Sequence, residues 1–141
     1  MYRKLVRLFP LVALLLAATA CGDNGNTPIT PDPIPDVQET FQGVLTLNGT
    51  VVHPFSVVGP SQIQAQLISL DPNPEKLIGM SLGTWNGSIC QVVLDNPAAK
   101  QGDVVQGATQ VVGNVNFCLR VYDPNGSIDP AQAYAVIVTH R

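Results

Sequence analysis

From residue 40 onward, apolar and polar residues alternate over short stretches of the chain. The clearest example is Ile63-Gln64-Ala65-Gln66-Leu67, in which every second side chain is apolar. A period of two is typical of a β-strand with one buried and one solvated face. Similar runs, rich in Val, Ile, Leu and aromatic residues, predict seven further strands over residues 41–47, 51–58, 77–84, 89–95, 104–112, 117–122 and 133–139. No window of a dozen residues has the apolar spacing of a helix, so the pattern predicts an all-β domain.

Residues that favour tight turns separate several of these predicted strands. Asn48-Gly49, Asn86-Gly87 and Asn125-Gly126 each lie between two β-like runs, and Asn-Gly pairs accept the positive φ values of hairpin turns. About eight short strands with frequent turns predict an antiparallel, jelly-roll-like β-sandwich. The alternation also predicts its core, which we expect to contain Phe41, Leu45, Leu47, Phe55, Val57, Ile63, Ala65, Leu67, Ile78, Met80, Leu82, Phe117, Leu119, Val121, Tyr134, Val136 and Val138.

The N-terminus has the organisation of a secretory signal. Three basic residues lie among the first seven, and an apolar stretch of 13 residues, 8–20, leads to Cys21. A membrane-spanning helix needs roughly 20 apolar residues, so we expect a cleaved signal peptide over residues 1–20. The tripeptide Ala18-Thr19-Ala20 before Cys21 resembles a bacterial lipobox, although Ala18 stands where that family prefers Leu.

The lipobox resemblance implies that the chain is cut before Cys21, that the Cys21 thiol receives diacylglycerol, and that the new N-terminus is acylated, for instance with palmitate. Each buried CH₂ adds about 0.8 kcal/mol, and two or more acyl chains give stable attachment. The sequence thus predicts a lipoprotein of the bacterial cell envelope that is attached to a membrane by its lipid anchor. Whether this is the inner or the outer membrane is left open by the sequence. An ordinary cleaved signal without lipidation is the alternative.

The stretch after Cys21 is unsuited to a packed core. Residues 22–39 contain four prolines and four acidic residues with few apolar side chains, a composition typical of disordered chain. We therefore expect a lipidated cysteine and disordered tether over residues 21–39, and a β-sandwich over 40–141. Without residues 1–20, the chain keeps four of its seven basic and all ten acidic residues, a net charge of −6. This charge disfavours nucleic acid as a partner.

Cys90 and Cys118 are the two cysteines of the predicted domain. Export places them in an oxidising compartment, where a pair of cysteines usually forms a disulfide. The alternative is a metal-binding or catalytic thiol pair, but no His or Cys lies near either residue at ligand spacing. Apolar residues lie at both phases around Cys90, so the alternation leaves open whether the disulfide is between the layers or on an outer surface.

Two segments resemble bacterial pre-peptidase C-terminal domains. Phe55-Ser56-Val57, the Gly59 turn and residues 63–70 are similar to that family's opening strands, and residues 117–122 and 134–138 are similar to its closing pair. The resemblance implies a jelly-roll-like β-sandwich of the kind appended to exported enzymes as an accessory or targeting module. This chain departs from the pattern because it has no catalytic domain and carries the paired cysteines.

Candidate catalytic and metal-binding residues form no convincing set. Gly79-Met80-Ser81-Leu82-Gly83 fits the G-x-S-x-G elbow of α/β-hydrolases, and His140 follows it, but the elbow requires a strand, a turn and a helix. The chain has two histidines, whereas a zinc site needs three or four ligands at recognisable spacing. Loop oxygens of Asp95, Asp123 and Asp129 are possible calcium ligands, although Asp is also a standard turn residue. We expect no catalytic residue, metal or cofactor.

Trp85 precedes a predicted turn and, with Tyr122 and Tyr134, is a candidate aromatic platform for a ligand. The sequence therefore predicts a non-catalytic envelope lipoprotein whose β-sandwich binds an unidentified glycan, peptide or protein. The alternatives are a small serine hydrolase that uses Ser81 and His140, and a purely structural envelope component.

Overall fold

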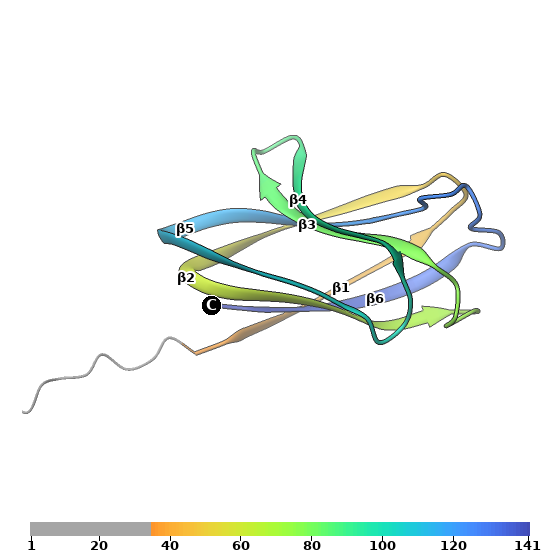
Figure 1. The fold of residues 1–141 in the computed structure, drawn as a ribbon, viewed down its shortest axis with the longest axis horizontal. Helices are drawn as coiled ribbons and strands as arrows, with labels where there is room; N and C mark the ends of the chain where they lie inside the picture. The colour runs from red at the N-terminus through yellow and green to blue at the C-terminus, as the bar shows by residue number, and fades with distance from the viewer. Residues whose placement is uncertain (1–34) are drawn as a thin grey trace, which may run out of the picture. The chain divides into compact units, whose positions relative to one another are not determined.

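The computed structural model describes residues 35–141, which contain six β-strands and no helix. The strands are β1 (Val37–Leu45), β2 (Thr50–Asp71), β3 (Ile78–Trp85), β4 (Cys90–Ala99), β5 (Val104–Tyr122) and β6 (Gln132–His140). They form one antiparallel sheet in the order β1-β6-β2-β5-β3-β4 (Figure 1). The predicted all-β, antiparallel class is confirmed. In this part of the chain, no helix is long and apolar enough to cross a bilayer.

The two longest strands, β2 and β5, belong to both layers of the fold. Their register shifts between Gly59 and Ser61, where residues 110–112 of β5 have no partner on β2. At this point both strands turn back together, so the sheet folds over itself (Figure 1). One layer then contains β3, β4 and the adjoining halves of β2 and β5, and the other contains β1, β6 and the remaining halves.

The structure has six strands where the sequence predicted eight. Residues 51–58 and 63–67 are both parts of β2, and residues 104–112 and 117–122 are both parts of β5. The bend requires a glycine at position 59, because a Cβ there would overlap the carbonyl oxygen of Val111. A glycine that reads as a turn in the sequence is thus an irregularity inside a continuous strand.

The core lies between the two layers, and the alternation predicted it well. The buried cluster comprises Leu45, Phe55, Val57, Ile63, Ala65, Leu67, Leu70, Ile78, Met80, Leu82, Ala99, Val105, Leu119, Val121, Ile128, Tyr134, Val136 and Val138, with Phe41 and Phe117 packed against it. Leu47 was wrongly expected in this core: it is 54% exposed. Because β1 ends at Leu45, Leu47 lies in the turn that follows and no longer alternates with the strand.

Side chains close the space between the layers at both sides. On one side the Phe41 ring of β1 stacks on His53 of β2, with 5.1 Å between the ring centroids. On the other side Leu94 of β4 lies against Gly107 of β5, where a Cβ would overlap it. β1 begins at Val37, so residues 37–39 belong to the fold and not to the predicted tether. Cys21, the predicted signal peptide and the tether up to residue 34 lie outside the described residues.

Candidate functional site

The hairpin formed by β3 and β4 is the candidate functional site. Its turn is the predicted Asn86-Gly87 turn, in which Gly87 has a φ of +97°. The side-chain oxygen of Asn86 accepts hydrogen bonds from the backbone N–H groups of Ser88 and Ile89, at 3.0 and 2.8 Å. This Asx arrangement fixes the tip of the hairpin, which projects away from the two layers (Figure 1).

The hairpin bends at Gly83. The β3–β4 register shifts between Leu82 and Gly83, which is the signature of a β-bulge. A Cβ at Gly83 would overlap the carbonyl oxygen of Gln91, so the β4 backbone passes directly over this glycine. The bend therefore depends on a position without a side chain, and it turns the tip of the hairpin out of the plane of the layer.

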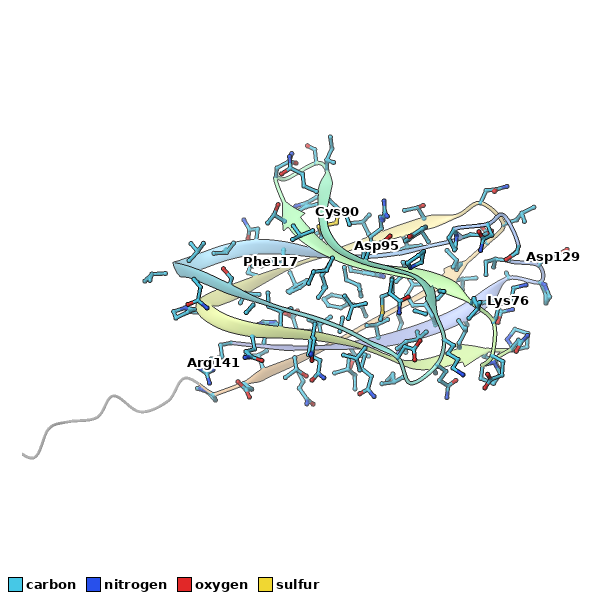
Figure 2. All side chains as sticks on the ribbon, in the orientation of Figure 1. Lys76, Cys90, Asp95, Phe117, Asp129 and Arg141 are labelled. Atoms are coloured by element: carbon cyan, nitrogen blue, oxygen red, sulfur yellow. A yellow bond between two sulfur atoms is a disulfide. The ribbon has the colours of Figure 1, made fainter. Side chains whose placement is uncertain are left out.

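A disulfide ties the hairpin to β5 at Cys90, the first residue of β4 after the turn. Cys90 and Cys118 are bonded, with their Cα atoms 5.7 Å apart, and Figure 2 shows the sulfur atoms where the hairpin leaves the layer. The predicted pairing is confirmed. Leu119 and Val121 point into the core, so alternation places Cys118 on the outer face, where it is fully buried. The sequence left open on which side of the sheet the disulfide lies. In the structure it lies on the outer face, beneath the hairpin.

A groove of about 450 Å³ lies beside Trp85 on the same outer face. Its walls come from three strands and the turn: Pro54 and Ser56 of β2, Asn116 of β5, Trp85 of β3, and Asn86 and Gly87. Trp85 is half-buried. The hydroxyl of Ser56 donates to Oδ1 of Asn116 at 2.8 Å, which holds these two polar side chains together across the β2–β5 pair. No charged side chain lines the groove.

Tyr122, the other residue expected in an aromatic platform, lies at the opposite end of β3. It pairs with Gly79, whereas Trp85 is the last residue of the strand. Its hydroxyl donates to both carboxylate oxygens of Asp95, each at 2.9 Å, and the Arg120 guanidinium lies 4.2 Å from its ring centroid. Burial and the contact with Asp95 raise the pKa of Tyr122. The structure does not bring Tyr122 and Trp85 together, and Tyr134 is buried in the core.

Ser81 and His140, the pair of the hydrolase alternative, have separate partners. Ser81 is a fully buried residue in the middle of β3, and its Oγ accepts a hydrogen bond from Nε of Arg120 at 3.2 Å. His140 lies at the end of β6, with its Nε2 2.7 Å from Oε1 of Glu39. G-x-S-x-G is therefore a strand segment here, not the strand–turn–helix elbow that a nucleophile needs.

Two of the three candidate calcium residues, Asp95 and Asp123, have structural partners. The Asp123 carboxylate accepts hydrogen bonds from four backbone N–H groups, those of Asn48, Asn125, Ser127 and Ile128. Asp95 binds Tyr122 as described above. Across residues 35–141, no three side chains of His, Cys, Asp or Glu gather in a way that would hold a metal ion.

Exposed aliphatic residues surround the hairpin on the side of β4. Ile89 is 63% exposed and Val93 is 69% exposed. Val93 also borders an apolar cavity of about 220 Å³ between the layers, which Leu82, Leu94 and Phe117 line with it. β4 is the last strand in the sheet order, so its outer edge has no strand partner in the described part of the chain. Unpaired edges and exposed apolar residues are features of interaction surfaces.

Sequence reasoning predicted the disulfide and named Trp85 as a candidate, but it did not identify the other residues of this candidate site. Pro54, Ser56 and Asn116 were not predicted to be site residues, because they meet Trp85 only through the pairing of β2 with β5 and of β5 with β3. These pairings join segments far apart in the chain. Within the hairpin, the apolar run Val92-Val93 was a local signal of an exposed apolar surface, but the same run is equally typical of a buried strand.

No protein-family model matches this chain, and no curated protein matches it. Among solved structures, it is similar to the crystal structure of Aeromonas hydrophila PliG, a periplasmic lysozyme inhibitor of g-type lysozyme. The two chains share 12% sequence identity with a TM-score of 0.52, over 74% of this chain and 86% of that chain. At this identity the likeness shows a common β fold alone. The resemblance to pre-peptidase C-terminal domains has no matching family model to support it.

Proposed function

We propose that this chain is a non-catalytic binding protein of the bacterial cell envelope, and that it binds a protein partner through the β3–β4 hairpin. The hairpin is the observation that carries this proposal. Its tip projects from the layers, Asn86 fixes the turn, and the Cys90–Cys118 disulfide fastens the strand directly after the turn to β5. A rigid binding element loses little conformational entropy on association, which favours affinity.

The chemistry of the hairpin fits a protein surface. Ile89 and Val93 present apolar side chains to solvent, and the cavity bordered by Val93 offers room for an apolar side chain of the partner. Protein interfaces concentrate their binding energy in a few such apolar anchors. The edge of β4 adds backbone groups to which an extended segment of a partner can pair.

The first candidate partner is a g-type lysozyme. The structurally similar PliG is a periplasmic inhibitor of that enzyme. A fold of this kind is therefore able to present a surface to a cell-wall hydrolase. The lipobox-like sequence before Cys21 supports a place in the envelope, with the fold held to a membrane by lipid.

Inhibition and binding of a purified g-type lysozyme by the full chain test this proposal. We expect the chain to slow lysis of a peptidoglycan suspension and to bind the enzyme directly in biolayer interferometry. Val93→Asp places a charge in the proposed interface and is expected to weaken binding by about tenfold or more, because charged groups are costly in an apolar contact.

Val112→Asp is the matched control, because Val112 is 84% exposed and lies in the bend, away from the hairpin. It makes the same chemical change and is expected to leave binding unaltered. Equal effects of both substitutions would overturn the hairpin as the interface. Absence of any binding to g-type lysozyme by the folded chain would overturn that enzyme as the partner.

A further inference from the structure

We infer that the groove beside Trp85 is a binding site for an uncharged saccharide. The groove lies on the outer face of β2, β5 and β3, where Pro54, Ser56, Asn116 and Trp85 meet. Its volume of about 450 Å³ falls in the range of about 300–1,000 Å³ that is usual for small-molecule sites. This inference does not depend on a protein partner for the hairpin.

Trp85 supplies the apolar surface of the site. Its indole is half-buried beside the groove, and Pro54 provides a second apolar wall. A tryptophan combines a large flat apolar face with a polar N–H edge. A pyranose ring has the matching character, because its C–H groups form an apolar face and its hydroxyl groups form a polar rim.

Two side-chain amides supply the polar contacts. Oδ1 of Asn116 accepts from Ser56, and Oδ1 of Asn86 accepts from two backbone N–H groups. Their carbonyl oxygens are thus engaged, whereas among residues 35–141 no acceptor is bound by Nδ2 of Asn86 or of Asn116. Each amide NH₂ carries two donors. The groove therefore presents hydrogen-bond donors to a ligand that carries acceptor oxygens.

The absence of charge in the groove indicates a neutral ligand. None of its lining residues is acidic or basic, so an ionised ligand would enter without a counter-charge, at a cost in desolvation. The residues after position 20 carry a net charge of −6, which further disfavours anionic ligands.

The side chains of the groove favour a saccharide over an extended peptide. An extended peptide is usually held by backbone hydrogen bonds along an unpaired strand edge. The groove is lined by an aromatic face and by amide side chains instead. The pairing of β3 with β5 ends at Thr84 and Phe117, so β5 has no β3 partner at Asn116, and a peptide is therefore the competing ligand class that the experiment must test.

Trp85 is the single tryptophan of the chain, so its fluorescence reports on the groove directly. We expect a saturable change in emission when the full chain is titrated with neutral trisaccharides, chitotriose and cellotriose as the two probes. Trigalacturonic acid, which is similar in size but anionic, is expected to give no change. A neutral tripeptide tests the competing ligand class and is also expected to give none.

Asn116→Ala removes one donor and is expected to weaken saccharide binding about 3- to 10-fold, as the loss of one hydrogen bond does. Asn114→Ala is the matched control, because Asn114 lies two residues away on the same face of β5 and does not line the groove. Trp85→Ala, followed by calorimetry, is expected to abolish binding, with thermal unfolding as the check that the variant is folded.

Failure of both neutral trisaccharides to give a saturable signal up to about 10 mM, the weak limit of useful affinity, would overturn the inference. So would binding of the tripeptide alone, or equal affinities of Asn116→Ala and the unaltered chain. Each of these results would leave the lysozyme measurements unchanged, so the two proposals fail separately.

Discussion

The hydroxyl of Tyr134 lies 2.7 Å from Nε2 of His53, and this hydrogen bond connects β6 of one layer with β2 of the other. Burial raises the pKa of Tyr134 to about 12. Burial also lowers the pKa of His53. The folded chain therefore favours the neutral form of both groups, and each shift makes stability depend on pH.

The first prediction concerns the two ends of the pH scale. His53 binds a proton more readily in the unfolded chain, so its contribution to stability is lost as pH falls below about 6.5. Tyr134 ionises first in the unfolded chain, so its contribution is lost as pH rises above about 10.

Urea unfolding across this range of pH measures both contributions to stability. Tyr134→Phe should cost about 1 kcal/mol at neutral pH and should flatten the alkaline decline; an unchanged alkaline decline would contradict the assignment.

The second prediction concerns the disulfide. The cysteines are 28 residues apart, and closing a loop of this size stabilises a fold by about 3–4 kcal/mol in the chain-entropy model. Cys90→Ala with Cys118→Ala should lower the free energy of unfolding by about this amount. Amide exchange should also accelerate in the hairpin more than in β6. Equal stability of the double variant and the unaltered chain would show that the hairpin is held without the bond.

The third prediction concerns the glycine beneath β4. Gly83→Ala forces the Gln91 carbonyl away from β3, and overpacking of this kind costs about 1–3 kcal/mol. Thermal unfolding monitored by circular dichroism measures the loss. Ser88→Ala lies at the exposed tip of the same hairpin and should change stability by less than about 0.5 kcal/mol. If the two variants melt alike, β4 does not pass over Gly83.

The fourth prediction concerns the loop after β5. Desolvation acts to raise the pKa of Asp123, but hydrogen bonds from the backbone N–H groups of Ser127, Asn48, Ile128 and Asn125 together lower it. The stability contributed by this carboxylate is therefore present above the unfolded pKa and lost as pH falls through the lower, folded pKa.

Asp123→Asn should destabilise the chain by roughly 1–2 kcal/mol at neutral pH, because it weakens several charge-assisted hydrogen bonds. It should also reduce the loss of stability in acid, which unfolding at a series of acidic pH values measures. Asp129→Asn makes the same change at an exposed carboxylate that accepts no hydrogen bond from the described residues, and it should have little effect. Matching acid profiles for both variants would refute the role of Asp123.

The fifth prediction concerns the N-terminus. Lipidation at Cys21 should place the protein in the membrane fraction of cells, and Cys21→Ser should release it, because the anchoring acyl chains are lost. Mass spectrometry of the N-terminal peptide should find the acyl groups on the unaltered chain alone. An unmodified mature N-terminus would leave an ordinary secreted protein.

Local alternation determined most of what the sequence could predict about the fold. Every predicted strand falls inside an observed strand over most of its length, because a buried face requires an apolar side chain at every second position. The count failed at Gly59 of β2 and at its partner Gly113 of β5, because the sequence cannot show whether a glycine ends a strand or bends it. That distinction depends on residues 110–112, which lie opposite the bend in the folded chain.

The candidate site was predictable only where its chemistry is local. The disulfide followed from export and cysteine number, and the Asn86-Gly87 turn followed from residue type. The separation of Tyr122 from Trp85 did not follow, since it is set by the register of β5 against β3. Registers between distant strands arise from the packing of the whole core, and a single sequence carries no direct signal of them.

The continuity of β2 and β5 through the bend also governs how the chain acquires its structure. Distant residues such as Thr50 and Tyr122 must pair before the layer that contains β3 and β4 is complete, and topologies with such non-local contacts fold slowly, on roughly a millisecond-to-second timescale. Neither layer can serve as a finished template for the other, because each contains half of the same two-stranded ribbon. The domain is therefore expected to form and to melt as one cooperative unit, without a half-folded species that exposes a single layer.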